Sequence, residues 1–408
     1  MDIAVVSFVS CFPTEWGSRR RILNLTRALR RLGHNVSFIY LSNSQMASGL
    51  VQAHQSEFGP GHFHMLEQNL PGRAQLFLRR IASKVSRVYR KVIGSSKAFG
   101  PRIDDTVTLD FIPQIKSLQA REHFEVVFGE YLQTSPALSA FGAQVFKVLD
   151  THDSLVNRHL LSGANGDTLH CNMEDQLRGF LRANAIVAIQ PQELDEFRDA
   201  LAGSEVSCHL VSHFLESEGP LECYKPIGAT FLGSQHSMNQ EAMAYFMRDI
   251  VPAVLDRIPQ FRLQLIGGIC ETIPDHPILD KLKNIEDLRI GFQRGPISIV
   301  PTLSGTGISI KLLDSMALGV PIVTTRTGAR GLGPAYRNGM VMVEDGDPRA
   351  FSQALIALLE SEGKRAEQGR LAYSDACCWH ETQMVALEEL LRDWVNRRES
   401  EHSRNLAP

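Results

Sequence analysis

The feature that most constrains the fold is a regular alternation of short apolar runs, rich in β-branched residues, with longer helical stretches. In the first half the runs are Ile3–Val9, Val36–Leu41, Phe124–Glu130, Phe146–His152, Ala185–Gln190 and Cys208–His213. In the second half they are Ala229–Ser234, Phe261–Gly268, Ile297–Thr302, Pro321–Thr325 and Met340–Glu344. Runs that are apolar without a break are typical of strands buried on both faces. The sequence therefore predicts an α/β, doubly wound fold with parallel sheets covered by helices.

The series of strands restarts near the middle of the chain. Residues 214–228, FLESEGPLECYKPIG, are acidic, contain Pro and Gly, and show no clear periodicity. Such a segment is typical of a linker, and 408 residues favour two or three domains. We expect a first domain at 1–215, a linker at 216–228, a second domain at 229–380, and a final helix and tail at 381–408. The final helix is predicted around Gln383–Arg398, where apolar residues recur on one helical face.

Composition excludes several classes of protein. The net charge of −3 gives no bias toward nucleic acid. Seven cysteines without a CxxC pair or a metal-ligand spacing indicate free thiols in a reducing compartment. The start, MDIAVVSFVSCF, lacks the positive lead of a signal peptide, and no apolar stretch reaches the 18 or so residues of a membrane span. We expect a cytoplasmic protein.

Several motifs together resemble one enzyme family. The strongest is Gly305–Thr325, GTGISIKLLDSMALGVPIVTT, followed by Thr327–Leu332. Phe231–Ser234 precedes Asn239 and a helix, Glu15–Arg20 precedes the first helix, and Thr151-His152-Asp153 stands at a strand end. Over most of the chain these segments resemble the GT-B-fold glycosyltransferases, specifically retaining family 4 (glycosyltransferase group 1). The resemblance implies two Rossmann-like domains that face a cleft, with the C-terminal helix crossing back to the first domain. It also implies a nucleotide-sugar donor.

Two departures from the family pattern concern the donor. The family has two glutamates eight positions apart, and here these positions hold Thr306 and Asp314. Its Arg and Lys pair after the first strand of the second domain is replaced by Gln235 and His236. The resemblance assigns catalytic positions to His152, Thr306 and Asp314, and Asp314 would accept hydrogen bonds from ribose hydroxyls. The expected donor-binding residues are Gly233, Ser234, Gly305, Thr306, Gly307, Ile308, Ser309, Lys311, Asp314 and Arg330.

The Gly-rich segment has a physical reason to bind a diphosphate. Glycines let the backbone approach a ligand closely, and a helix N-terminus presents free N–H groups with partial positive charge. Lys311 adds a full charge in the first turn of the expected helix. A plain strand–turn–helix with Asp314 on a solvated face is the alternative interpretation.

The first domain offers a second set of candidates. Gly17, Ser18, Arg19 and Arg20 open its first helix after a strand end, where doubly wound folds bind ligands, although the arginines could also be surface residues. We expect Arg21 on the solvated helix surface. His152 is predicted near the reacting centre or, alternatively, bonded to a backbone carbonyl, with at most one of Asp150 and Asp153 on its side.

Further positions in the first domain are open. His213 ends the last apolar run before the linker, and Glu130 and Tyr131 end another run, where they could meet the acceptor. Residues 73–102 carry basic residues without an acidic one, with apolar residues at helical spacing. This basic helix could contact an anionic membrane, form a wall for an anionic acceptor, or simply pack as an ordinary helix.

The predicted reaction uses neither a metal nor a cofactor. No Asp-x-Asp motif stands where a nucleotide-sugar metal site would need one, so helix amides and cations would stabilise the leaving diphosphate. The acceptor would be a glycan, a lipid-linked compound or a small molecule, in polysaccharide biosynthesis or in the glycosylation of a metabolite. A GT-B-fold nucleotide-sugar epimerase and a non-catalytic partner subunit remain open. A nicotinamide dehydrogenase is disfavoured, because no GxGxxG follows the first strand.

Overall fold

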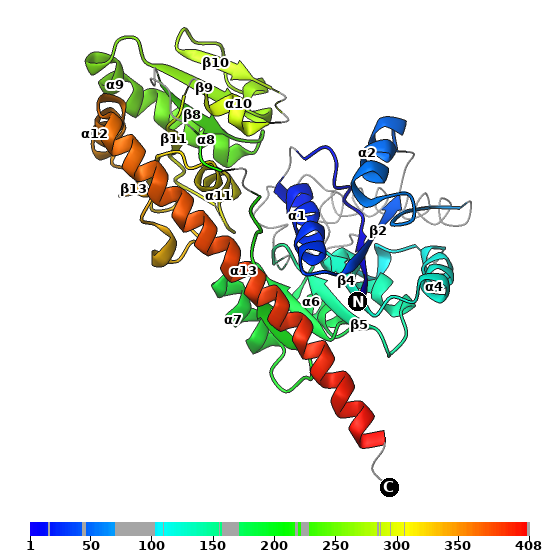
Figure 1. The fold of residues 1–408 in the computed structure, drawn as a ribbon. Helices are drawn as coiled ribbons and strands as arrows, with labels where there is room; N and C mark the ends of the chain where they lie inside the picture. The colour runs from blue at the N-terminus through cyan, green and yellow to red at the C-terminus, as the bar shows by residue number, and fades with distance from the viewer. Residues whose placement is uncertain are drawn as a thin grey trace, which may run out of the picture. The chain divides into compact units, whose positions relative to one another are not determined.

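The chain forms two compact units (Figure 1). The computed structural model describes residues 1–405 except 15–16, 43–45, 70–102, 109, 155, 157–170, 217–218, 222–227, 284, 286, 294 and 306. The first unit comprises Met1–Pro13, Ser18–Ser212 and Ala386–Pro408, and the second comprises Thr14–Gly17 and His213–Val385. Each unit contains its own sheet.

The first unit is built on a seven-stranded sheet with the order β3-β2-β1-β4-β5-β6-β7. Its strands are β1 (Asp2–Ser7), β2 (Asn35–Ser42), β3 (Phe63–Glu67), β4 (Val126–Glu130), β5 (Phe146–Asp150), β6 (Ala185–Ala188) and β7 (Ser207–Leu210). Every neighbouring pair is parallel. All carboxyl ends of the strands therefore lie at one edge of the sheet.

Helices cover both faces of this sheet. They are α1 (Gly17–Arg31), α2 (Ser48–Phe58), α4 (Phe111–Glu122), α6 (Met173–Phe180) and α7 (Pro191–Ala200), with 3-10 helices η1 (Ile103–Asp105) and η2 (Leu132–Ala140). Ala4 and Val6 of β1 pack into the core that includes Phe111 of α4. The alternate residues Ile3 and Val5 are also fully buried. Burial on both faces is the reason for the unbroken apolar runs.

The second unit contains a six-stranded parallel sheet with the order β10-β9-β8-β11-β12-β13. Its strands are β8 (Gly228–Leu232), β9 (Arg262–Ile266), β10 (Leu279–Leu282), β11 (Ser298–Val300), β12 (Ile322–Thr325) and β13 (Met340–Val343). Its helices are α8 (Ser237–Tyr245), the π-helical turn η3 (Phe246–Ile250), α9 (Val251–Arg257), α10 (Leu288–Phe292), α11 (Ile310–Ala317) and α12 (Pro348–Glu360), with 3-10 helices η4 (Gly268–Glu271) and η5 (Pro334–Tyr336). Two parallel Rossmann-like sheets confirm the predicted fold class.

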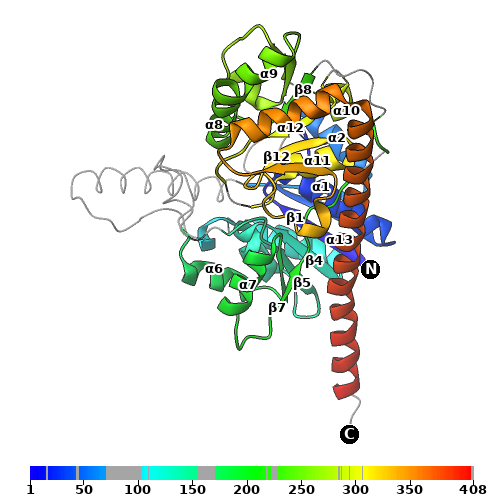
Figure 2. The ribbon, with the colours of Figure 1, turned by 90° about the vertical axis from the view of Figure 1, so that its left-hand side faces the viewer.

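The last helix, α13 (Glu362–Asn405), belongs to both units. Figures 1 and 2 show it as one long helix, coloured orange to red. In the second unit Trp379 donates its ring N–H to the carbonyl of His213 (2.8 Å). In the first unit Trp394 stacks on Phe146 with ring centroids 5.5 Å apart. The return of the C-terminal helix to the first domain is therefore confirmed.

The predicted start of this helix, near Gln383, is wrong. Helix α13 begins at Glu362, and its early part packs through small residues. Ala372 and Ala376 are buried, and a Cβ on Gly369 would lie 2.3 Å from the carbonyl oxygen of Gly319. Such close backbone packing leaves no stripe of large apolar residues to mark the helix in the sequence.

Two strands were not predicted, β3 and β10. Each is an edge strand of its sheet, and most of its residues are only half-buried. Their sequences, FHMLE and LDKL, lack the continuous apolar run that marks the inner strands. Within the described residues, no helix is both long and apolar enough to cross a membrane.

Candidate functional site

In the second unit the turn between β11 and α11 requires its glycines. Gly305 has φ +139° and Gly307 has φ +72°, conformations that side-chain-bearing residues rarely adopt. A Cβ on Gly305 would lie 2.8 Å from Nη2 of Arg330, and one on Gly331 would lie 3.0 Å from Cα of Ile308. The turn therefore packs directly against the loop that follows β12. The predicted catalytic Thr306 lies outside the described residues.

Lys311 stands in the first turn of α11, held by residues from β8 and α8. Its Nζ donates to Oδ1 of Asn239 (2.6 Å) and lies 5.0 Å from the ring centroid of Phe231. Asn239 in turn donates to the carbonyl of Ser234 (3.0 Å). Burial, with a smaller effect of the Arg330 charge, lowers the pKa of Lys311 to about 7. The ammonium is thus fixed where an anion would stabilise its charge.

Arg330 is the second cation at this turn. Its Nη1 donates to the carbonyl of Thr327 (3.0 Å), and burial lowers its pKa. A guanidinium remains protonated at neutral pH, so burying Arg330 costs free energy of solvation. A bound anion would offset that cost. Both cations come from segments other than the Gln235-His236 position, where the family pattern has its basic pair.

The N-terminus of α11 offers hydrogen-bond donors beside these cations. Ser309 occupies the N-cap position, yet its side chain caps no backbone amide. Its hydroxyl is buried, with the residue 2% exposed, and has no hydrogen-bond partner among the described residues. The first turn of α11 contains no acidic residue. Helix N-terminal amides, an unpaired hydroxyl and two cations are together groups that can bind an anion.

The remaining expected donor residues lie around this turn. Gly233 and Ser234 follow β8, and a Cβ on Gly233 would lie 3.3 Å from Cγ of Asn239. Asp314 lies about one turn beyond Lys311 on α11 and is partly exposed. A carboxylate there can accept from two hydroxyls at once.

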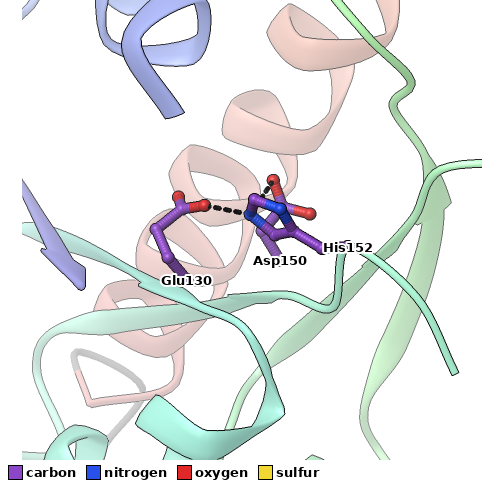
Figure 3. A group of neighbouring side chains, drawn as sticks. All are labelled: Glu130, Asp150 and His152. Carbon is purple, nitrogen blue, oxygen red and sulfur yellow. Dashed lines mark hydrogen bonds and ion pairs between the residues drawn. The ribbon is translucent and has the colours of Figure 1, made fainter. Parts of the chain in front are cut away.

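In the first unit three titratable side chains meet at the carboxyl ends of β4 and β5 (Figure 3). Nε2 of His152 lies 2.5 Å from Oε2 of Glu130 and 4.0 Å from Oδ2 of Asp150. Glu130 is 0% exposed, Asp150 1% and His152 7%. Burial, then the Asp150 charge, raises the pKa of Glu130, while His152 and Arg21 oppose the rise. Glu130 therefore lies against His152, with none of its own surface exposed.

Arg21 is not on the solvated surface, and that expectation is wrong. It is 4% exposed, and its Nε and Nη2 donate to the two carboxylate oxygens of Asp150 (3.0 and 2.9 Å). Nη2 also donates to the carbonyl of Val211 (2.9 Å). A buried carboxylate requires such a partner, and the run of three arginines in the sequence hides which of them supplies it.

His152 and Tyr131 both adopt left-handed backbone conformations, with φ +58° and +68°. Their rings stack with centroids 3.9 Å apart. The backbone N–H of Tyr131 donates to the carbonyl of Asp150 (2.7 Å). Strain of this kind, about 1–3 kcal/mol per residue, is concentrated at functional sites in proteins. His152 itself lies two residues beyond the end of β5, not within the strand as predicted.

The three side chains at this edge could in principle hold a metal, because one ligand atom from each lies within 4.8 Å of the others. The geometry fits a shared proton better. Both oxygens of Asp150 already accept from Arg21. A separation of 2.5 Å between His152 and Glu130 is a hydrogen-bond distance, shorter than the roughly 3 Å between two ligands that each lie about 2 Å from a metal.

The other positions predicted within residues 1–215 include Gly17 and His213, which belong to the second unit. Gly17 and Ser18 open α1, and Nη1 of Arg19 donates to the carbonyl of Phe12 (2.9 Å). Arg20 is partly exposed. His213 lies beyond β7, which ends at Leu210, and is 1% exposed. The whole basic segment 73–102 lies outside the described residues, as do Glu15 and Trp16.

Sequence reasoning missed Glu193 at the same sheet edge. It lies in the first turn of α7 and is 3% exposed. Burial and the nearby charge of Asp153 raise the pKa of Glu193 to about 7. The only signal in the sequence was a Pro-Gln-Glu helix start after a buried strand.

The comparisons with known proteins agree with this architecture. Residues 227–361 match the family model described as Glycosyl transferases group 1. No curated protein sequence matches the chain. Sucrose-phosphate synthase from Thermosynechococcus elongatus superposes with a TM-score of 0.64 at 13% identity, covering 97% of this chain and 99% of that chain.

Two further solved structures are similar. HepE from Anabaena, in complex with UDP and glucose, gives a TM-score of 0.61 at 12% identity over 96% of this chain and 100% of that one. TarM from S. aureus, in a complex that contains UDP, gives 0.66 at 9% identity over 96% and 99%. The chain therefore has the GT-B fold, and its residues 227–361 match the Glycosyl transferases group 1 model.

Proposed function

We propose that the chain is a retaining, metal-independent glycosyltransferase that moves a sugar from a nucleotide-sugar donor to a glycan, a lipid-linked acceptor or a small molecule. One observation carries the proposal. At the N-terminus of α11 the Ser309 hydroxyl has no partner among the described residues, and Lys311 and Arg330 lie beside it with lowered pKa values. These groups suit a diphosphate.

In this proposal the cation pair takes the place of the basic residues that the family pattern has after Ser234. Lys311 and Arg330 would neutralise the diphosphate. Asn239 would hold Lys311 in place, since it links this ammonium to Ser234. In this proposal Asp314 binds the ribose, and Gly305, Gly307 and Ile308 bring the backbone close to the phosphates. Thr306 stands at the position of the donor-sugar glutamate.

The proposed reaction needs no group transfer onto the protein. The acceptor hydroxyl attacks the anomeric carbon on the face from which the diphosphate leaves, and a diphosphate oxygen takes the hydroxyl proton. The bond from the anomeric carbon to the leaving oxygen breaks as the new glycosidic bond forms. The α11 amides, Lys311 and Arg330 stabilise the charge that develops on the leaving group. His152 would contact the transferred sugar or orient the acceptor.

The solved neighbours suggest which donors to test first. HepE is described with UDP and glucose, the pneumococcal transferase GtfA with UDP and GlcNAc, and the E. coli neighbour with UDP-2-fluoro glucose. UDP-glucose and UDP-GlcNAc are therefore the first candidates. Anionic vesicles would test the proposed peripheral membrane contact through residues 73–102.

The test is a thermal-shift screen with nucleoside diphosphates and nucleotide sugars, followed by transfer assays with the donor that binds. A ligand that binds the native state raises the melting temperature. The Lys311→Met variant should lose the shift. Lys281→Met is the control, because Lys281 pairs with Asp275 at the edge strand β10. A product of inverted anomeric configuration would overturn retention, and isomerisation of the donor without an acceptor would identify an epimerase. Lack of any nucleotide binding would favour a partner subunit.

A further inference from the structure

The contact between Glu130 and His152 determines which ring nitrogen of the histidine is available. Nε2 is engaged at 2.5 Å by Glu130. Nδ1 makes no hydrogen bond to any residue in the described part of the chain, although 7% of His152 remains exposed. Stacking on Tyr131 and the left-handed backbone hold the ring in this orientation. Any substrate atom that His152 contacts through a ring nitrogen must therefore approach Nδ1.

The charges around the pair determine how many protons it holds. Arg21 and Asp150 form an ion pair with zero net charge. The thiol of Cys11, which also feels the Glu130 charge, is neutral because burial raises its pKa. The charge of the cluster is then the sum over Glu130 and His152 alone. A net charge is costly in a site as buried as this one.

Three arrangements of the pair are neutral, and one of them is disfavoured. With the Glu130 proton on Oε1 and Nε2–H donating to Oε2, the proton would lie on a buried oxygen that has no hydrogen-bond partner among the described residues. Two neutral arrangements remain. In one, ionised Glu130 faces an imidazolium, and in the other, protonated Glu130 donates to Nε2 of a neutral ring. The raised pKa of Glu130 brings the second arrangement within reach of the first. Both arrangements leave a proton on Nδ1. The remaining form, ionised Glu130 beside a ring protonated only at Nε2, buries one uncompensated negative charge.

We propose that Glu130 is a positioning residue that fixes His152 as a hydrogen-bond donor through Nδ1–H, so that the histidine binds a substrate oxygen and does not serve as a base. This inference rests on the proposed transfer reaction for its catalytic meaning, but not for the state of the ring. The acceptor proton then has to go elsewhere, which agrees with its transfer to the leaving diphosphate. The substrate group that meets Nδ1–H is an oxygen with a free lone pair, on the transferred sugar or the acceptor.

The state of the ring can be measured on the full chain without substrate. Long-range proton–nitrogen correlation spectra of histidine-labelled protein distinguish protonated from bare ring nitrogens, and the His152 signals are those lost in His152→Asn. The inference requires a protonated Nδ1 at neutral pH. A bare Nδ1 with a protonated Nε2 would refute it, whether or not the protein transfers sugar.

Variants connect the ring state to catalysis. Glu130→Gln cannot balance an imidazolium, and its amide can face either tautomer, so the Nδ1 proton is no longer fixed. We expect kcat to fall roughly tenfold to a hundredfold, by analogy with the loss of carboxylates that orient metal-bound histidines. The KM for the donor should change little, and the alkaline limb of the kcat–pH profile should move to lower pH.

Two further variants separate positioning from general loss of structure. Glu130→Asp keeps a carboxylate and should restore part of kcat together with the Nδ1 proton. Glu57→Gln removes a carboxylate that pairs with Arg27 and Arg30 in the same unit and should leave both readouts unchanged. Equal kcat and an unchanged pH profile in Glu130→Gln would overturn the positioning role. Failure of the wild-type protein to transfer any sugar would overturn the proposed function, but not the assigned proton.

Discussion

Arg21 and Asp150, 129 residues apart in the chain, form a buried bidentate ion pair beside the Glu130–His152 contact. The pair ties α1 to the carboxyl end of β5, and Arg21 also bonds the carbonyl of Val211 beyond β7. Three segments from different parts of the first unit are thus fixed around one guanidinium. The position of His152, two residues after Asp150, depends on this connection.

Replacing Arg21 by Met should destabilise the first unit strongly. The substitution leaves the Asp150 carboxylate buried without its partner, and breaking a buried pair in this way costs about 3–5 kcal/mol. The double variant Arg21→Met/Asp150→Leu should recover part of the loss, because it removes the uncompensated charge. Calorimetric melting of the two variants beside wild type measures both effects. A double variant less stable than Arg21→Met would show that the charge is not the cause.

The affinity for a nucleoside diphosphate should depend on pH through Lys311. Its pKa is lowered to about 7 in the free protein, and a bound diphosphate favours the charged form and raises that pKa. Binding therefore takes up a proton above pH 7, so the affinity falls as the pH rises from about 7, by up to tenfold per unit while the bound form stays protonated.

Lys311→Arg provides the matched control for this pH dependence. A guanidinium stays charged throughout the range, so the variant should bind with nearly constant affinity between pH 7 and about 9. Titration calorimetry with UDP at several pH values measures the slope. If UDP affinity fell with pH equally in wild type and in Lys311→Arg, the group responsible for the pH dependence would not be Lys311.

Glu193 should make the folded state less stable as the pH rises. Its pKa is raised from an ordinary value of 4.5 to about 7. Between these values the folded state binds more protons than the unfolded state, so stability falls as the pH increases through this window. The stability lost across the whole window is a few kcal/mol, on the order of 1.4 kcal/mol per unit of pKa change.

Glu193→Gln removes this titration. Relative to wild type, the variant should gain stability on going from pH 4.5 to pH 8, and melting temperatures at the two values compare the proteins. The unfolded glutamate has an ordinary pKa of 4.5, so the difference in stability between the two proteins is small at the acid end. A constant difference in melting temperature across the window would contradict the raised pKa.

Gly305→Ala should weaken donor binding more than it weakens the fold. With φ +139° an alanine is strained there, and its Cβ would press on the guanidinium of Arg330, 2.8 Å away. We expect a displaced Arg330 and a loss of UDP affinity. Gly33→Ala is the matched control, because Gly33 also has positive φ, and no atom lies within 4 Å of its Cβ position. Equal UDP affinity in the two variants would show that Arg330 does not take part in donor binding.

The sequence predicted those parts of the structure whose burial pattern is visible along the chain. Inner strands such as β1 and β4 are covered on both faces, so they appear as unbroken apolar runs. The edge strands β3 and β10 are covered on fewer sides and were missed. The early part of α13 packs through small residues and left no apolar stripe.

The candidate site also has a part that the sequence could predict and a part that it could not. The turn before α11 could be predicted, because its glycines and Lys311 follow one another in the sequence. The contact of Glu130 with His152 could not, since it depends on the pairing of β4 with β5 and on two left-handed residues. Arg21 was assigned to the surface, because a helical arginine shows its buried carboxylate partner only in three dimensions.

Hydrogen exchange with and without UDP tests the central claim most directly, because it locates the diphosphate without requiring an acceptor. We expect UDP to slow exchange at the backbone amides of Ile308 to Lys311, which precede the first intrahelical hydrogen bond of α11, and Lys311→Met to abolish this protection. Bound UDP that protects other segments and leaves these amides unchanged would contradict the claim.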